Sequence, residues 1–183
     1  MPPRTIHVVD YDPEWPDLFV RLRERIWPSV SDFAAGIEHM GSTSVPGLAA
    51  KPVIDIDIVV PSRQDIPLAV TRLASLGYIH VGDLGVQDRE AFDNPPGSLG
   101  HHLYLCPSDS IALQNHLVLR DHLRSNPSDV AAYSALKMRL AREFPHDIAS
   151  YIEGKSNFIL SILAKRGFSP DSIDSIRKAN QRA

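Results

Sequence analysis

The chain has 183 residues, which corresponds to about one domain at roughly 150 residues per domain. Apolar residues make up 43% of the chain and charged residues 22%, which excludes a disordered or collagen-like protein. No apolar run approaches the roughly 18 residues of a membrane span, and the first residues lack the apolar core of a secretory signal. The net charge of −3 argues against a dedicated nucleic-acid binder. Because Cys106 is the single cysteine, no internal disulfide can form, and we expect a cytoplasmic protein.

Charge is unevenly distributed along the chain. Residues 1–60 contain five Lys/Arg and nine Asp/Glu, whereas residues 110–166 contain eight and five. Two interpretations remain open at this point. The acidic and basic halves are unrelated solvated faces, or they place acidic metal ligands opposite basic groups that hold phosphates.

The first half of the chain is predicted to contain short strands and helices. Residues 5–9 are rich in β-branched side chains, which favours a strand. Pro13 is typical of the first turn of a helix, and apolar residues recur every four positions after it. The predicted elements are a strand over 5–9, a helix over 13–28, a strand over 52–60, a helix over 66–76 that ends at Gly77, and a strand over 78–81.

The second half is predicted to be mainly helical. Residues 82–100 contain four glycines and two prolines and predict a long loop, of the kind that often carries function. The elements after it are a strand over 102–105, helices over 110–124, 127–142 and 147–166, and a polar tail over 167–183 that is either frayed or a loose helix. We therefore expect one α+β domain over 1–166, with a small mixed sheet over about 1–106 and a helical cap over about 107–166.

Two aspartates interrupt the otherwise apolar strand predicted over 52–60. Side chains alternate along a strand, so Asp55 and Asp57 point to one face, and the isoleucines at positions 54, 56 and 58 point to the other. Two neighbouring carboxylates in an apolar strand repel each other and lose hydration. A divalent cation offsets both costs, and Mg²⁺ uses such carboxylates together with substrate phosphate oxygens. The alternative is that both aspartates lie at an exposed strand end.

A Gly-Ser turn precedes this strand. Gly41 lets the backbone approach a ligand closely, and the hydroxyls of Ser42 and Ser44 suit a phosphate, although an ordinary polar turn has the same composition. Fourteen residues separate Gly41 from Asp55, which is enough for a turn and a return strand that bring the two together. The segment is neither a P-loop nor a hydrolase nucleophile elbow, because the Gly-Lys-Ser/Thr and Gly-x-Ser-x-Gly motifs are absent from it.

A Gly-Ser turn followed by Asp-apolar-Asp resembles the signature of the nucleotidyltransferase superfamily, whose polymerase-beta-like members use it to hold metal and nucleoside triphosphate. The closer resemblance is to the GrpB family, and it covers about residues 5–165. The segments that carry it are EHMGSTSVPGLAAKP from Glu38 to Pro52, His101-His102-Leu103-Tyr104, His116 with Arg120-Asp121-His122-Leu123-Arg124, Tyr133-x-x-Leu136-Lys137, and Tyr151-x-x-x-Lys155-x-x-Phe158-Ile159. The resemblance implies a nucleotidyltransferase-like α+β fold: a small mixed sheet with flanking helices and a C-terminal helical bundle.

The resemblance also implies a set of site residues. Asp55, Asp57 and His102 are expected to be catalytic, with the two aspartates as ligands of Mg²⁺ or Mn²⁺. Nucleotide and phosphate binding is expected at Gly41, Ser42, Ser44, Lys51, Arg120, Lys137, Tyr151 and Lys155. Solvation at the surface, or pairing within one helix, is the alternative for each of the basic residues.

The pattern departs from that of an active transferase in one respect. Members of the superfamily place a third carboxylate on a following strand, and the strand predicted over 102–105 contains no acid. His102 can take that position as a metal ligand or proton acceptor, or it can serve only as a hydrogen-bonding group of the sheet. Asp83, Asp88 and Glu90 of the predicted loop are weaker substitutes.

Three functions follow from these observations. The first is metal-dependent transfer of a nucleotidyl group from a nucleoside triphosphate to an unknown acceptor. The second is a non-catalytic module that binds a nucleotide, coenzyme A or another phosphorylated metabolite. GrpB-like domains fused to dephospho-CoA kinase point to coenzyme A metabolism. The third is a metal-dependent hydrolase of phosphate esters. We expect a phosphorylated small molecule as partner, and neither a membrane nor nucleic acid.

Overall fold

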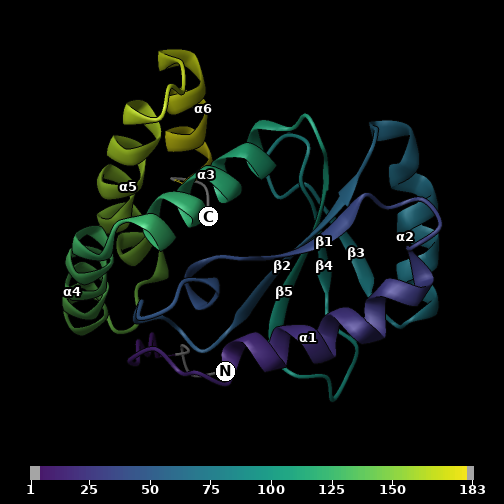
Figure 1. Ribbon diagram of the computed structural model, residues 1–183, viewed down its shortest axis with the longest axis horizontal. Coiled ribbons are helices and arrows are strands. Elements are labelled where there is room, and N and C mark those ends of the chain that lie inside the picture. The colour runs from purple at the N-terminus through teal and green to yellow at the C-terminus, as the bar shows by residue number, and fades with distance from the viewer. Residues whose placement is uncertain (1–4, 181–183) are drawn as a thin grey trace.

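The computed structural model describes residues 5–180, which form a mixed five-stranded sheet and six α-helices (Figure 1). The strands are β1 (Gly36–Met40), β2 (Ile54–Val60), β3 (Ile79–Gly82), β4 (Glu90–Asp93) and β5 (His101–Pro107). The helices are α1 (Trp15–Ile26), α2 (Ile66–Ser75), α3 (Ile111–Ser125), α4 (Pro127–Glu143), α5 (Ile148–Lys165) and α6 (Pro170–Asn180). The α+β class and the mixed sheet agree with the prediction. Within the described chain, none of the helices has both the length and the apolar character needed to cross a bilayer.

The strands lie in the order β1-β2-β5-β4-β3, with β2 and β5 parallel and the other neighbours antiparallel. The central strand β2 therefore has β1 on one side and β5 on the other. Its register places Asp55 between Met40 and His102, and Asp57 between Glu38 and Tyr104. Residues that are directly opposite on paired strands point to the same face, so the register groups polar side chains on one face of the sheet.

The other face of the sheet forms the main hydrophobic core. Ile54, Ile56 and Ile58 of β2 are buried there together with Leu103 and Leu105 of β5. Helices α1 and α2 cover this face, because their amphipathic stripes supply buried residues to the same core (Figure 1). The alternation predicted for β2 is thus seen in the structure, with its isoleucines in the core and its aspartates on the opposite face.

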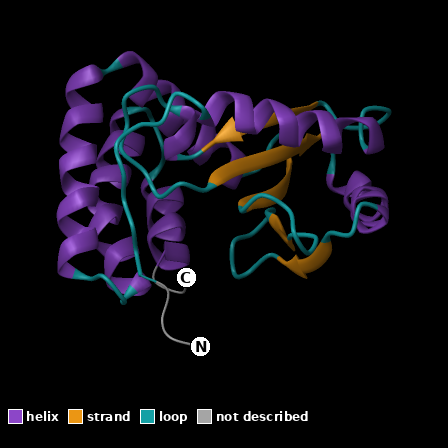
Figure 2. Cartoon of the chain, turned by 90° about the horizontal axis from the view of Figure 1, so that it is seen from below, coloured by secondary structure: helices purple, strands orange, loops and turns teal. Residues whose placement is uncertain are grey.

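Helices α3, α4, α5 and α6 gather at one side of the sheet, where Figure 2 shows them as a bundle. Helix α3 follows β5 directly and packs against β1 and β5. Helices α4 and α5 pack closely at Gly154, where an added Cβ would meet the side chain of Leu140. The bundle therefore stands beside the polar face of the sheet, and its inward-facing side chains reach the aspartates of β2.

Three segments differ from the prediction. Residues 5–9 form no strand in the described chain: only Val9 makes a β-bridge, with Ala50, and Ile6 instead donates its amide hydrogen to the carbonyl of Pro145. The predicted loop over 82–100 contains β4, which is too short for a periodic signal to reveal. The polar segment after 167, expected to be frayed or a loose helix, forms the packed helix α6, because Ile176 is buried against α5.

Candidate functional site

Each aspartate of β2 is paired with a histidine. The Asp57 side chain is completely buried, and its Oδ2 lies 2.7 Å from Nδ1 of His116 on α3. Asp55 is partly exposed, and its Oδ1 lies 2.8 Å from Nδ1 of His102 on the neighbouring strand. The second oxygen of Asp57, Oδ1, is buried and has no hydrogen-bond partner within residues 5–180. A buried carboxylate oxygen without a partner is costly, so this atom is suited to bind a cation or to accept from a donor.

The Gly-Ser turn lies directly over Asp55. Gly41 has a φ of +67°, and a Cβ at this position would overlap the Asp55 carboxylate, so only glycine allows so close an approach. A 3₁₀ turn over Ser42–Ser44 follows. The Ser44 hydroxyl is buried and donates to the carbonyl of Gly41 at 2.7 Å. Ser44 therefore closes the turn, and Ser42 is the hydroxyl that faces outward from it.

Three lysines surround Ser42. Lys137 of α4 is buried, and its Nζ donates to Oγ of Ser42 at 2.8 Å. Burial, together with the nearby charge of Lys155, lowers the pKa of Lys137 to about 6. Burial and the charge of Lys51 lower the pKa of Lys155 to about 8. The Nζ atoms of Lys155 and Lys51 lie 4.5 Å and 5.9 Å from the ring centroid of Tyr151. Three lysine side chains thus crowd one turn, and an anion bound among them would favour their charged forms, which is the electrostatic condition of an anion site.

Two cavities open on either side of the turn and Asp55. We name the first, of about 240 Å³, the turn cavity; it is lined by Gly41, Arg89, Tyr104, His116 and Arg120, among others. We name the second, of about 190 Å³, the lysine cavity; it is lined by Lys51, His102, Lys137 and Tyr151, among others. Ser42, Asp55 and Lys155 line both cavities. The structure thus brings together all the predicted site residues except Asp57 and Ser44, which lie beneath the cavity walls.

Arg120 is at the edge of the turn cavity and already has acidic partners. Its Nη1 lies 2.7 Å from Oε2 of Glu38, and its Nε lies 2.8 Å from Oδ1 of Asp121. Glu38 is opposite Asp57 on β1, so it is a third acid on the polar face. A phosphate at Arg120 would therefore compete with two carboxylates. A phosphate at the three lysines would meet less competition from acidic side chains.

The loop acids do not replace the missing carboxylate of β5. Asp88 pairs with Arg63 at 2.7 Å, and Glu90 pairs with His80 at 2.7 Å. Asp83 accepts a hydrogen bond from the amide of Gly85. All three are engaged away from Asp55, so their suggested role as substitutes is wrong. The positions of β5 beside the two aspartates of β2 are occupied by a histidine and a tyrosine.

Sequence reasoning missed three residues of the site. His116 and Arg89 are separated from the β2 aspartates by long stretches of chain, and only the fold brings them there. Tyr104 belongs to the predicted strand, and its place beside Asp57 follows only from the parallel pairing of β2 with β5. A prediction of this parallel pairing would have placed Tyr104 in the site. It would not have placed His116 or Arg89 there.

The residues fit a divalent cation only if a ligand supplies part of its coordination. Asp55 and Asp57 present two carboxylates on one face, and the Oδ1 of Asp57 has no partner among the described residues. Over residues 5–180, however, no group of three His, Cys, Asp or Glu side chains is arranged to hold a metal ion. This ligand set suits Mg²⁺, because Mg²⁺ is commonly bound by one or two carboxylates together with phosphate oxygens and waters.

Comparison with known proteins identifies the family. A family model described as "GrpB protein" matches residues 5–165. The chain belongs to the GrpB family. This GrpB chain is 32% identical over 158 residues to a UPF0157 protein of Bacillus subtilis, covering 86% of this chain and 46% of the relative. It therefore spans about half the length of that relative.

A crystal structure of the conserved protein GrpB from Enterococcus faecalis has the same fold as this GrpB chain. The TM-score is 0.77 at 29% identity, covering 93% of this chain and 99% of that one. The chain is also 26% identical over 175 residues to a dephospho-CoA kinase of Mycolicibacterium paratuberculosis, covering 82% of this chain and 43% of the kinase. These likenesses establish family and fold, and the chemistry has to be argued from the site.

Proposed function

We propose that this chain binds a nucleoside triphosphate across the turn and lysine cavities and transfers its nucleotidyl group to an acceptor. The observation that carries the proposal is the convergence of a glycine-hydroxyl turn, a strand carboxylate and three lysines at one pair of adjoining cavities. A triphosphate requires positive charge, hydroxyl and amide donors, and a route to a divalent cation. The lysines offer the charge, the turn offers the donors, and the aspartates of β2 offer carboxylates for a cation.

The lysine cavity is the place for the β- and γ-phosphates. Lys137 and Lys155 have lowered pKa values because they are desolvated close to other lysines, and an anion between them would reverse that shift. Ser42, already held by Lys137, offers its hydroxyl and the amide of a tight turn. The α-phosphate then lies over Asp55, where the two cavities meet.

The reaction follows from this placement. An acceptor hydroxyl oxygen forms a bond to the α-phosphorus, and the bond from that phosphorus to the bridging oxygen breaks. Pyrophosphate leaves with the electron pair. The acceptor proton passes to a base on the side away from the lysine cavity; His116 lines that side and is held at Nδ1 by Asp57, whereas His102 lines the lysine cavity beside the leaving pyrophosphate. Asp55 and Asp57 would hold Mg²⁺, and the cation would neutralise charge on the phosphate oxygens.

A second candidate is a non-catalytic module that binds a nucleotide or coenzyme A. Two observations favour it. The position beside Asp55 on β5 holds a histidine instead of a carboxylate, and a dephospho-CoA kinase contains a region similar to this chain. Such a module would bind the ligand without releasing pyrophosphate.

The experiment is calorimetric titration of the full chain with ATP, the other nucleoside triphosphates and coenzyme A, with and without Mg²⁺. The variant is Asp55→Asn, and the matched control is Asp10→Asn, since Asp10 is exposed and lies outside both cavities. We expect Mg²⁺-dependent triphosphate binding that Asp55→Asn weakens by at least about tenfold, while Asp10→Asn binds as the wild type does. Equal affinity with and without Mg²⁺, unchanged in Asp55→Asn, would contradict the proposal. Pyrophosphate release over a panel of acceptors then separates the transferase from the binding module.

A further inference from the structure

A third cavity, the largest of the three at about 420 Å³, adjoins the site. We name it the loop cavity. Its walls are the loop over 85–89, the first turns of α3 and the C-terminal half of α6. Arg89 and His116 line both the loop cavity and the turn cavity, so the two are neighbours across these side chains. A molecule in the loop cavity would therefore lie next to a ligand bound at Asp55.

Arg89 is an unmatched cation at this junction. Its guanidinium carbon lies 4.5 Å from the ring centroid of Tyr104, in the geometry of a cation–π contact. Its Nε is buried, and it has no hydrogen-bond partner in the described part of the chain. A guanidinium carries five N–H donors and suits a planar or tetrahedral oxyanion in a two-pronged contact. The buried Nε–H therefore remains available to an anionic ligand in the adjoining cavity.

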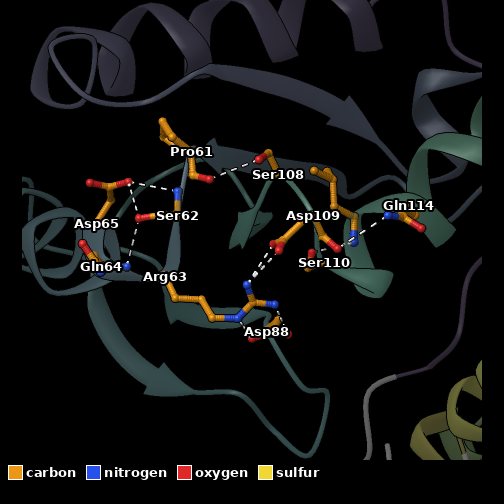
Figure 3. Close-up of polar contacts among 11 residues, drawn as sticks. Pro61, Ser62, Arg63, Gln64, Asp65, Asp88, Ser108, Asp109, Ser110 and Gln114 are labelled. Atoms are coloured by element: carbon orange, nitrogen blue, oxygen red, sulfur yellow. Dashed lines mark hydrogen bonds and ion pairs between the residues drawn. The ribbon is translucent and has the colours of Figure 1, made fainter.

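The neighbouring acid cannot neutralise Arg89, because another arginine holds it. Arg63 donates from Nε and Nη2 to the two oxygens of Asp88, at 2.8 Å and 2.7 Å, and from Nη1 to Asp109 at 2.9 Å (Figure 3). This fork ties the loop to the turn before α3 and uses both oxygens of Asp88. Lys178, the other cation of the loop cavity, pairs with Asp174 at 2.6 Å. Among the described cations that line the cavity, Arg89 therefore lacks an acidic partner.

We propose that the loop cavity binds the acceptor of the transfer reaction, and that this acceptor is a small molecule with a phosphate or carboxylate group held by Arg89. Val86, Ile111 and Ile176 supply an apolar wall for its remaining part, and Asn115 and Asn180 supply amide groups. The acceptor role rests on the proposed function, whereas the anion site stands on the loop cavity and Arg89 alone. The junction at His116 would bring the bound acceptor alongside the α-phosphate.

The test is a titration of the full chain with inorganic phosphate and, separately, with acetate, followed by methyl NMR. Signals from Val86, Ile111 and Ile176 report the loop cavity, and the signal from Ile152 reports the lysine cavity. We expect phosphate or acetate to shift the loop-cavity signals. Phosphate alone would indicate a phosphorylated acceptor, and equal binding of acetate would indicate a carboxylate.

Arg89→Gln is the decisive variant, and Arg139→Gln is its control, since Arg139 is exposed on α4 and lines none of the three cavities. We expect Arg89→Gln to weaken the loop-cavity response by about tenfold or more, and Arg139→Gln to leave it unchanged. Loop-cavity shifts of unchanged affinity in Arg89→Gln, or no such shifts in the wild type, would overturn the proposal.

Ser175→Trp is a second variant that tests the loop cavity even if Arg89→Gln fails to fold. Ser175 is exposed on α6 and lines the loop cavity, so a large side chain there blocks the cavity without removing a buried contact. We expect it to abolish the loop-cavity shifts and to spare those of Ile152; retention of the loop-cavity shifts would count against the site. A wild type that fails to bind Mg²⁺–ATP but shows the Arg89-dependent shifts would refute the proposed function and leave the anion site intact.

Discussion

Replacement of Lys137 by methionine should make the protein more stable at neutral pH. Lys137 is 2% exposed, and the burial that lowers its pKa to about 6 means that folding removes a proton from a side chain whose ordinary pKa is 10.5. At pH 7 this costs about 1.4 kcal/mol for each of the 3.5 pH units between 7 and 10.5, or about 5 kcal/mol. The lost hydrogen bond to Ser42 is worth about 1 kcal/mol. We therefore expect Lys137→Met to raise the free energy of unfolding by up to about 4 kcal/mol.

The sign of the pH dependence gives a second, independent check. The folded state binds fewer protons at Lys137 than the unfolded state between pH 6 and 10.5, so the wild type gains stability as the pH rises through this window. The advantage of Lys137→Met should then shrink from about 4 kcal/mol at pH 7 to about 1 kcal/mol at pH 9. Below pH 6 it should be constant, because Lys137 is then charged in both states.

Urea denaturation at pH 7, 8 and 9 measures these free energies. Lys165→Met is the matched control: Lys165 is exposed on α5, and its replacement should change stability by no more than about 0.5 kcal/mol. A Lys137→Met protein that is no more stable than the wild type at pH 7, or whose gain does not fall toward pH 9, would refute the idea that Lys137 is desolvated. The same variant should lose triphosphate binding, and wild-type binding should take up protons as the ligand restores the charge of Lys137.

Two glycine substitutions test the backbone of the site and of the bundle. Gly41→Ala should cost about 1–3 kcal/mol in the free energy of unfolding and abolish Mg²⁺–ATP binding, because φ is +67° and the new Cβ displaces the Asp55 carboxylate. Gly36→Ala is its control, since a Cβ there meets nothing within 4 Å, and normal ATP binding by Gly41→Ala would contradict the close approach. Gly154→Ala should destabilise the α4–α5 contact by about 1–3 kcal/mol in thermal unfolding, because its Cβ meets Leu140. Leu140→Val should recover part of that loss, and a double variant no better than Gly154→Ala alone would show that the two residues are not in contact.

Periodicity was sufficient to predict the part of the site that depends on a single strand. Alternation along β2 places Asp55 and Asp57 on one face and three isoleucines in the core, and both follow from neighbouring residues alone. The Gly-Ser turn also follows locally, because the close approach to Asp55 needs a glycine and a short return connection. Local sequence is informative here because the geometry is decided within about fourteen residues.

The remaining part of the site depends on how distant segments pair. His116 reaches Asp57 only because α3 crosses the polar face of the sheet. Arg89 is available to bind an anion because Asp88, its neighbour in sequence, is paired with Arg63 on a different segment. No residue near Arg89 in sequence indicates this. The predicted strand over 5–9 failed for the same reason: its residues have strand propensity, but their partners are Ala50 and the carbonyl of Pro145, and neither extends a sheet.

Three buried charged groups that lack full pairing gather at or beside the polar face of the sheet, and this argues for a ligand site on that face. Asp57 is completely buried with one oxygen unpartnered among the described residues, Lys137 is buried beside a second lysine, and Arg89 has a buried donor without a partner. Burial of a charged group without full pairing costs stability at each of these positions. The opposite face holds two buried histidines, His39 and His101, whose pKa values are lowered because burial disfavours their charged forms; each ring has a hydrogen-bond partner, Thr43 or Tyr78, so neither leaves an unmatched charge. A phosphorylated, metal-bound ligand across the turn and lysine cavities would place negative charge beside Lys137 and a cation beside Asp55, and a separate anion in the loop cavity would match Arg89; a simple anion at the lysines alone would leave the carboxylates of β2 without a cation.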